Sequence, residues 1–160
     1  MRKKTDKILS TIVILAMSLL VVDVLLQVFS GLLLKNSNPL SFTSELAEFL
    51  LIWVGLLGGA YASGKKQHLS IDLLRRKLKP DKQLLLSQFI NILVFLFSAV
   101  VLIIGGVRFV IINIKLEQIS SALQIPMFYV YLVLPISGIF ICYYAFDDVI
   151  LDGRKRVNIE

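Results

Sequence analysis

The chain has 160 residues, of which 57% are hydrophobic, and it carries a formal net charge of +6. This apolar share exceeds that of soluble domains, and too few residues lie outside the apolar runs to form a separate soluble catalytic domain. The basic residues lie between apolar runs and not on one face of a soluble surface, which argues against a nucleic-acid partner.

Four long apolar runs determine the predicted fold. They cover residues 8–30, 44–63, 83–112 and 126–146. Each reaches the roughly 20 residues with which a helix crosses a ~30 Å hydrocarbon core. A helix also satisfies its own backbone hydrogen bonds in lipid. The sequence therefore predicts an all-α membrane protein, with residues 1–160 forming a single integral membrane domain of four transmembrane helices.

The basic residues predict how these helices are oriented. Of the 17 Lys and Arg residues, 14 lie in the amino-terminal tail, in residues 64–82 or in the carboxyl-terminal tail. Short segments rich in Lys and Arg stay on the cytoplasmic side of a membrane. Both termini and the 64–82 segment are therefore predicted to be cytoplasmic, and the first and third connections to lie outside.

The first two runs carry acids near their outer ends. Asp23 lies in the outer half of the first run, and Glu45 and Glu48 open the second, where the helix dipole favours anions. Ionisable side chains within membrane spans are costly and deserve a functional hypothesis. These three residues are therefore candidates for charge contacts between helices or with another subunit.

The middle of the second run combines small residues with one tryptophan. Gly55 and Gly59 have the small-xxx-small spacing that allows close helix packing in lipid. Trp53 lies away from the membrane interface where tryptophan is usually found. We expect the glycine face to pack within the bundle and the Trp53 face to meet a partner subunit.

The connection between the second and third runs is strongly basic. Residues 64–82 have a moderate amphipathic pattern, which predicts a short helix lying at the cytoplasmic headgroups. The alternative is a solvated basic loop that only fixes the topology. On the first interpretation, cations of this segment contact lipid headgroups: Lys65, Lys66, Arg75, Arg76, Lys77 and Lys79.

The last two runs add one charge and two prolines. Arg108 lies near the outer end of the third run, at a depth similar to that of the three acids. Three roles remain open for these charges: pairing within the chain, contact with a partner, and an ion relay. Pro126 is predicted to occupy the first helical position of the fourth helix and Pro135 to kink it.

Signs of catalysis are missing from the sequence. His68 is the only histidine, and no Cys or carboxylate cluster accompanies it at metal-ligand spacing. No serine has a histidine base at hand, and no phosphate-binding glycine pattern occurs. We therefore expect no enzyme, no catalytic, substrate-binding or metal-binding residue, and no cofactor.

Two stretches resemble a known family. Residues 38–62 (NPLSFTSELAEFLLIWVGLLGGAYA), continued by 68–72 (HLSID), look like the second helix of the small, DctQ-like membrane subunit of tripartite ATP-independent periplasmic (TRAP) transporters. Residues 121–138 (SALQIPMFYVYLVLPISG) are similar to that family's last helix, including both prolines. The chain departs from the usual pattern at Phe42, Ser44 and Glu48, where the family often has Trp, Glu and Arg.

The resemblance implies a role in a three-part transporter of the bacterial inner membrane. A periplasmic binding protein captures an organic acid, and a large membrane subunit moves it with a sodium gradient. The small subunit then acts as a scaffold for the large one. Two alternatives stay open: a self-sufficient homo-oligomeric transporter with Asp23 as its coupling carboxylate, and a membrane anchor or assembly factor without a transport role.

Overall fold

A computed structural model describes residues 2–33, 41–65 and 80–157. Four helices in it are long and apolar enough to cross a membrane, which confirms the predicted all-α membrane fold. The elements are α1 (Arg2–Leu33), α2 (Ser41–Gly64), α4 (Pro80–Phe97), the π-helix η1 (Ser98–Gly105), α5 (Gly106–Lys115), α6 (Phe128–Tyr131) and α7 (Val133–Val157). The third span runs through α4, η1 and α5 without a break, and the fourth through α6 and α7.

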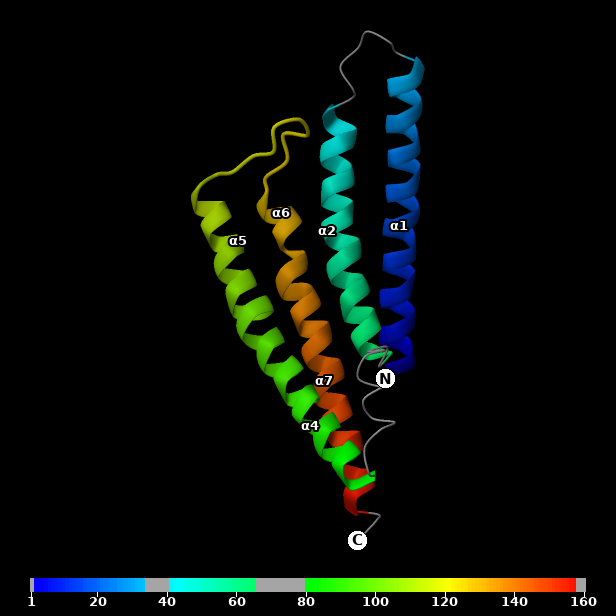
Figure 1. The fold of residues 1–160 in the computed structure, drawn as a ribbon. Helices are drawn as coiled ribbons and strands as arrows, with labels where there is room; N and C mark the ends of the chain where they lie inside the picture. Colours follow the sequence, from blue (N-terminus) through cyan, green and yellow to red (C-terminus); the bar gives the residue numbers. More distant parts are fainter. Residues whose placement is uncertain (1, 34–40, 66–79, 158–160) are drawn as a thin grey trace.

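The helices form a row. α1 packs against α2, α2 against α7, and α7 against α4 and η1, so that α1 and the α4–η1–α5 helix are the two edges (Figure 1). α1 begins and α7 ends at the same end of the row, here called the termini end. The opposite end carries the connection 116–127 and is called the loop end. A row buries little apolar surface, and large apolar side chains are exposed along every span.

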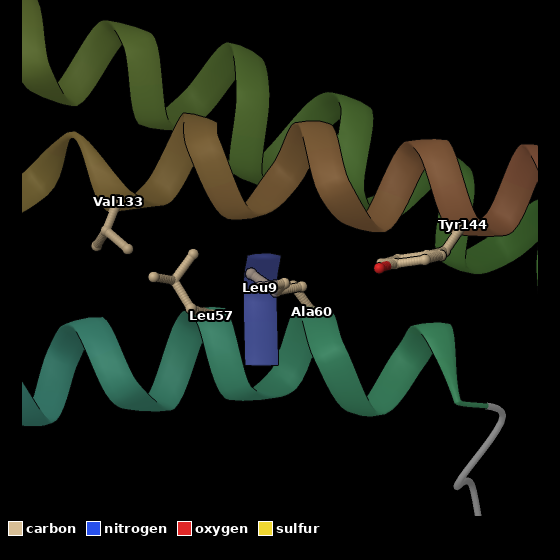
Figure 2. Close-up of a cluster of buried hydrophobic side chains, with 5 residues drawn as sticks. All are labelled: Leu9, Leu57, Ala60, Val133 and Tyr144. Atoms are coloured by element: carbon tan, nitrogen blue, oxygen red, sulfur yellow. The ribbon is translucent and has the colours of Figure 1, made fainter. Parts of the chain in front are cut away.

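The main apolar core lies where α1, α2 and α7 meet. Its fully or nearly fully buried members are Leu9 from α1, Leu57 and Ala60 from α2, and Val133 and Tyr144 from α7 (Figure 2). Because lipid tails are as apolar as these side chains, the cluster gains from close packing more than from the hydrophobic effect. The α7 helix, with neighbours on both sides, is the most buried of the four spans.

The second contact is a close crossing of η1 and α7. The buried Ser98 Oγ donates a hydrogen bond to the Gly138 carbonyl at 2.9 Å. A Cβ at Gly138 would lie 2.9 Å from side-chain atoms of Leu102 and Ile103, and one at Gly106 would lie 2.9 Å from Leu134 Cβ. The two glycines thus let the backbones approach, and the wider π-helical turns lie at this contact.

The helix boundaries differ from the predicted ones in instructive ways. The first helix starts at Arg2 instead of residue 8, because its charged first turn continues the helix beyond the apolar run. Pro126 is not the first helical residue: it forms an isolated β-bridge with Ile119, and α6 begins at Phe128. Residues 66–79, with most of the predicted headgroup contacts (Lys66, Arg75, Arg76, Lys77 and Lys79), lie outside the described residues.

Candidate functional site

Glu45 fastens the loop end of α2 to the connection 116–127. Its carboxylate accepts hydrogen bonds from the backbone N–H groups of Ser121, Ala122 and Leu123, at 2.9, 2.9 and 2.7 Å. It also accepts one from Ser120 Oγ at 3.1 Å. Successive backbone N–H groups converging on one carboxylate form an anion-binding nest. This carboxylate is therefore engaged in hydrogen bonds within the chain.

The connection that Glu45 holds is itself compact. Ser120 N–H donates to the Ile125 carbonyl and Met127 N–H to the Gln118 carbonyl, both at 2.9 Å. Gln124 takes a positive φ of 54°, which the backbone needs to turn back within so few residues. The connection at the loop end is thus folded on itself by backbone hydrogen bonds. The sequence predicted only that this connection leads into the last helix.

Asp23 is a buried residue in the half of α1 that is nearer the loop end. It is only 5% exposed, and its Oδ2 atom has no hydrogen-bond partner among the described residues. One turn further along α1, Gln27 donates a hydrogen bond to Ser44 Oγ of α2. The helix α1 is thus tied to α2 by Gln27.

Arg108 lies on the opposite edge of the row from Asp23. The buried side of α5 carries Gly106, Val110 and Asn113, and Arg108 projects from the exposed side. In the part of the chain that the structure describes, Arg108 makes no ion pair. Within the described residues Arg108 therefore pairs with none of Asp23, Glu45 and Glu48: α1 and α5 are the two edges of the row, and the Glu45 carboxylate is bound to the connection.

Glu48 is exposed on α2, one turn beyond Glu45. It shares a stripe with Leu51, Gly55 and Gly59, which are also exposed. No described residue pairs with its carboxylate. Arg108 and Glu48 are thus two charges of opposite sign that lie within the spans and find no partner in the described chain.

The two faces of α2 are the reverse of those expected from the sequence. Trp53 is partly buried and packs against the core cluster of Figure 2. Gly55 and Gly59 have open space where a Cβ would stand, with no heavy atom within 4 Å. Trp53 therefore packs within the bundle, and the two glycines do not pack against another of the described helices. Both faces are apolar enough for lipid, so that composition alone did not distinguish them.

A polar cluster at the termini end joins three helices. Tyr144 Oη of α7 donates a hydrogen bond of 2.7 Å to Asp6 Oδ1 of α1. Lys65, just after α2, lies 3.7 Å from the other oxygen of Asp6. Gly64 makes room for the tyrosine, since a Cβ there would lie 2.7 Å from its ring. The sequence predicted that Lys65 contacts lipid, and the structure places its ammonium group beside Asp6.

Comparisons with known proteins agree on one family. The family model of the tripartite ATP-independent periplasmic transporters, DctQ component, matches residues 8–154. A TRAP transporter small permease protein of Haemophilus influenzae is 28% identical over 144 residues, covering 88% of this chain and 86% of the relative. The isethionate TRAP transporter permease protein DctMQ of Oleidesulfovibrio alaskensis is 29% identical over 96 residues. That match covers 60% of this chain but only 15% of the relative.

Proposed function

Because this chain belongs to the DctQ component family of TRAP transporters, we propose that it braces a large membrane subunit during uptake. The chain is a multi-pass protein of the inner membrane. The family is a permease component and not an enzyme family. The proposal rests chiefly on one observation: Glu48 and Arg108 lie exposed within the spans, without partners in the described chain. A charge facing hydrocarbon is costly, and a complementary charge on a second subunit removes that cost.

The row of helices also supports a scaffold. The four described spans lie side by side in a row, so the chain has two broad apolar faces. A larger partner can pack against either face. The DctMQ relative, whose name combines both membrane components in one permease protein, further supports association with a large subunit.

The transport role follows from the family. We propose sodium-driven uptake of an organic acid that a periplasmic protein delivers, and isethionate in the relative's name is such an acid anion. The termini end then faces the cytoplasm, as the 14 basic residues of the two tails and the 64–82 segment favour. The loop end with its Glu45-held connection faces the periplasm, where a binding protein would dock.

The interface assignment is tested by affinity capture of the large subunit from membranes that contain both chains. Arg108→Leu and Glu48→Leu should each reduce the recovered large subunit roughly fivefold, because each leaves a partner charge unpaired near the interface. Lys115→Leu, which removes a cation from the end of the same helix as Arg108, is the control and should have little effect.

Two results would count against the proposal in different ways. If the unmodified chain captures no large subunit, the scaffold role itself is wrong, and a membrane anchor without a transport role becomes the better interpretation. If capture succeeds and neither variant weakens it, the scaffold stands but these two charges are not at the interface.

A further inference from the structure

One face of α1 at the termini end is hollowed and basic. The hollow has a volume of about 420 Å³, and its described lining is Lys4, Lys7, Ile8, Thr11 and Ile12. Spacings of three and four residues place these side chains on one face of the helix. The opposite face carries Asp6 and Leu9, which meet α2 and α7. The described wall of the hollow is therefore the face of α1 that points away from the bundle, at the edge of the row.

The two lysines of the hollow have no counter-charge in the described chain. Lys4 and Lys7 are both exposed. Asp6, their neighbour in sequence, is held on the other side of α1 by Tyr144 at 2.7 Å and Lys65 at 3.7 Å. Two cations three residues apart, with their neighbouring acid engaged elsewhere, form a site for an anion.

The surface beyond the lysines is apolar. Thr11 Oγ1 donates its hydrogen bond to the Lys7 carbonyl at 2.8 Å, so its hydroxyl needs no other partner. Ile8, Ile12, Leu15 and Leu19 continue the same face and are 59, 41, 65 and 52% exposed. From Ile8 to Leu19 the helix rises about 16 Å, comparable with the length of an extended fatty acyl chain.

We propose that this face binds one anionic phospholipid, with its phosphate between Lys4 and Lys7 and one acyl chain along Ile8, Ile12 and Leu15. The order of chemistry along α1, two cations and then a stripe that is apolar apart from Thr11, matches a headgroup followed by a tail. An anionic headgroup is favoured over a zwitterionic one, because no acid in the described lining attracts the positive group of a zwitterionic headgroup.

Native mass spectrometry of the full chain tests this, alone and co-purified with the large subunit. Phosphatidylglycerol and phosphatidylcholine with identical acyl chains are supplied in equal amounts. The unmodified chain should retain one phosphatidylglycerol in clear preference. Lys4→Gln and Lys7→Gln should each lower that preference about fivefold, and the corresponding arginine variants should keep it. Lys115→Gln removes the same charge elsewhere and should change nothing.

Several results would overturn the site. The site would be overturned if the unmodified chain retained both lipids equally. It would also be overturned if both glutamine variants kept the preference for phosphatidylglycerol unchanged. Displacement of the lipid by glycerol phosphate would indicate a site for free phosphate. Loss of the preference on co-purification would show that the large subunit covers this face. Helical content measured by circular dichroism ensures that only folded variants are compared, and both lysines are exposed, so each single variant should fold.

Discussion

Single residues near the two ends of the row hold its helices together, and they do so with polar groups. Glu45 at the loop end accepts hydrogen bonds from three successive backbone N–H groups. Tyr144 and Asp6 at the termini end join α7 to α1. Between them most contacts are apolar and gain little over lipid, and the Ser98–Gly138 hydrogen bond between η1 and α7 is an exception. The ends of the helices are therefore where single substitutions should act most clearly.

Glu45→Gln should loosen the connection 116–127 while leaving the helices in place. The amide oxygen is a weaker acceptor than a carboxylate, and the NH₂ group of glutamine cannot accept from the backbone. Hydrogen–deuterium exchange at the amides of Ser121, Ala122 and Leu123 should become roughly tenfold faster. Glu48→Gln, one turn away and without such contacts, is the control. Equal exchange in both variants would show that Glu45 does not hold the connection.

Tyr144→Phe should destabilise the chain by about 1–2 kcal/mol, because it removes a hydrogen bond to a carboxylate and keeps the ring. The readout is the free energy of unfolding of the purified chain in detergent. Tyr129→Phe removes the hydroxyl of a tyrosine that is 54% exposed and should have almost no effect. A loss of the same size in both variants would mean that the Asp6 contact adds nothing.

At the scale of the elements, the crossing of η1 and α7 should be the least tolerant of added volume. Gly138→Ala would place a methyl group 2.9 Å from Leu102 and Ile103 side-chain atoms, and we expect a cost of about 1–3 kcal/mol. Gly55→Ala, where nothing lies within 4 Å, should stay within about 0.5 kcal/mol of the unmodified chain. Thermal unfolding of the two variants compares them directly. A larger loss at Gly55 would contradict the observed crossing.

The elements also show what a sequence reveals about a membrane protein. The four spans were predictable because lipid requires about 20 apolar residues in a helix. The neighbours of each helix were not, since lipid-facing and helix-facing surfaces are both apolar. For this reason the sequence did not predict that the Trp53 face of α2 packs within the bundle and that the Gly55 face is exposed. The role of Glu45 could not be predicted for another reason: most of its partners are backbone N–H groups far along the chain, which no side-chain pattern marks.

At the scale of the whole molecule, the described chain is an open row with exposed apolar faces, and two exposed charges of opposite sign, Glu48 and Arg108, lie unpaired near the loop end of its spans. Resemblance to the family is enough to suggest the scaffold role. The geometry adds the particular charges, Arg108 and Glu48, that a partner is proposed to meet. Neither could have been separated from Asp23 or Glu45 by sequence alone, because all four lie at similar depth near the loop end.

The proposed scaffold role is tested most directly by uptake into proteoliposomes under a sodium gradient, with the binding protein and labelled organic acid outside. Vesicles containing both membrane subunits should accumulate the acid, and vesicles with only the large subunit or only this chain should not. Accumulation by this chain alone would contradict the account and favour a self-sufficient transporter, in which Asp23 becomes the carboxylate to examine.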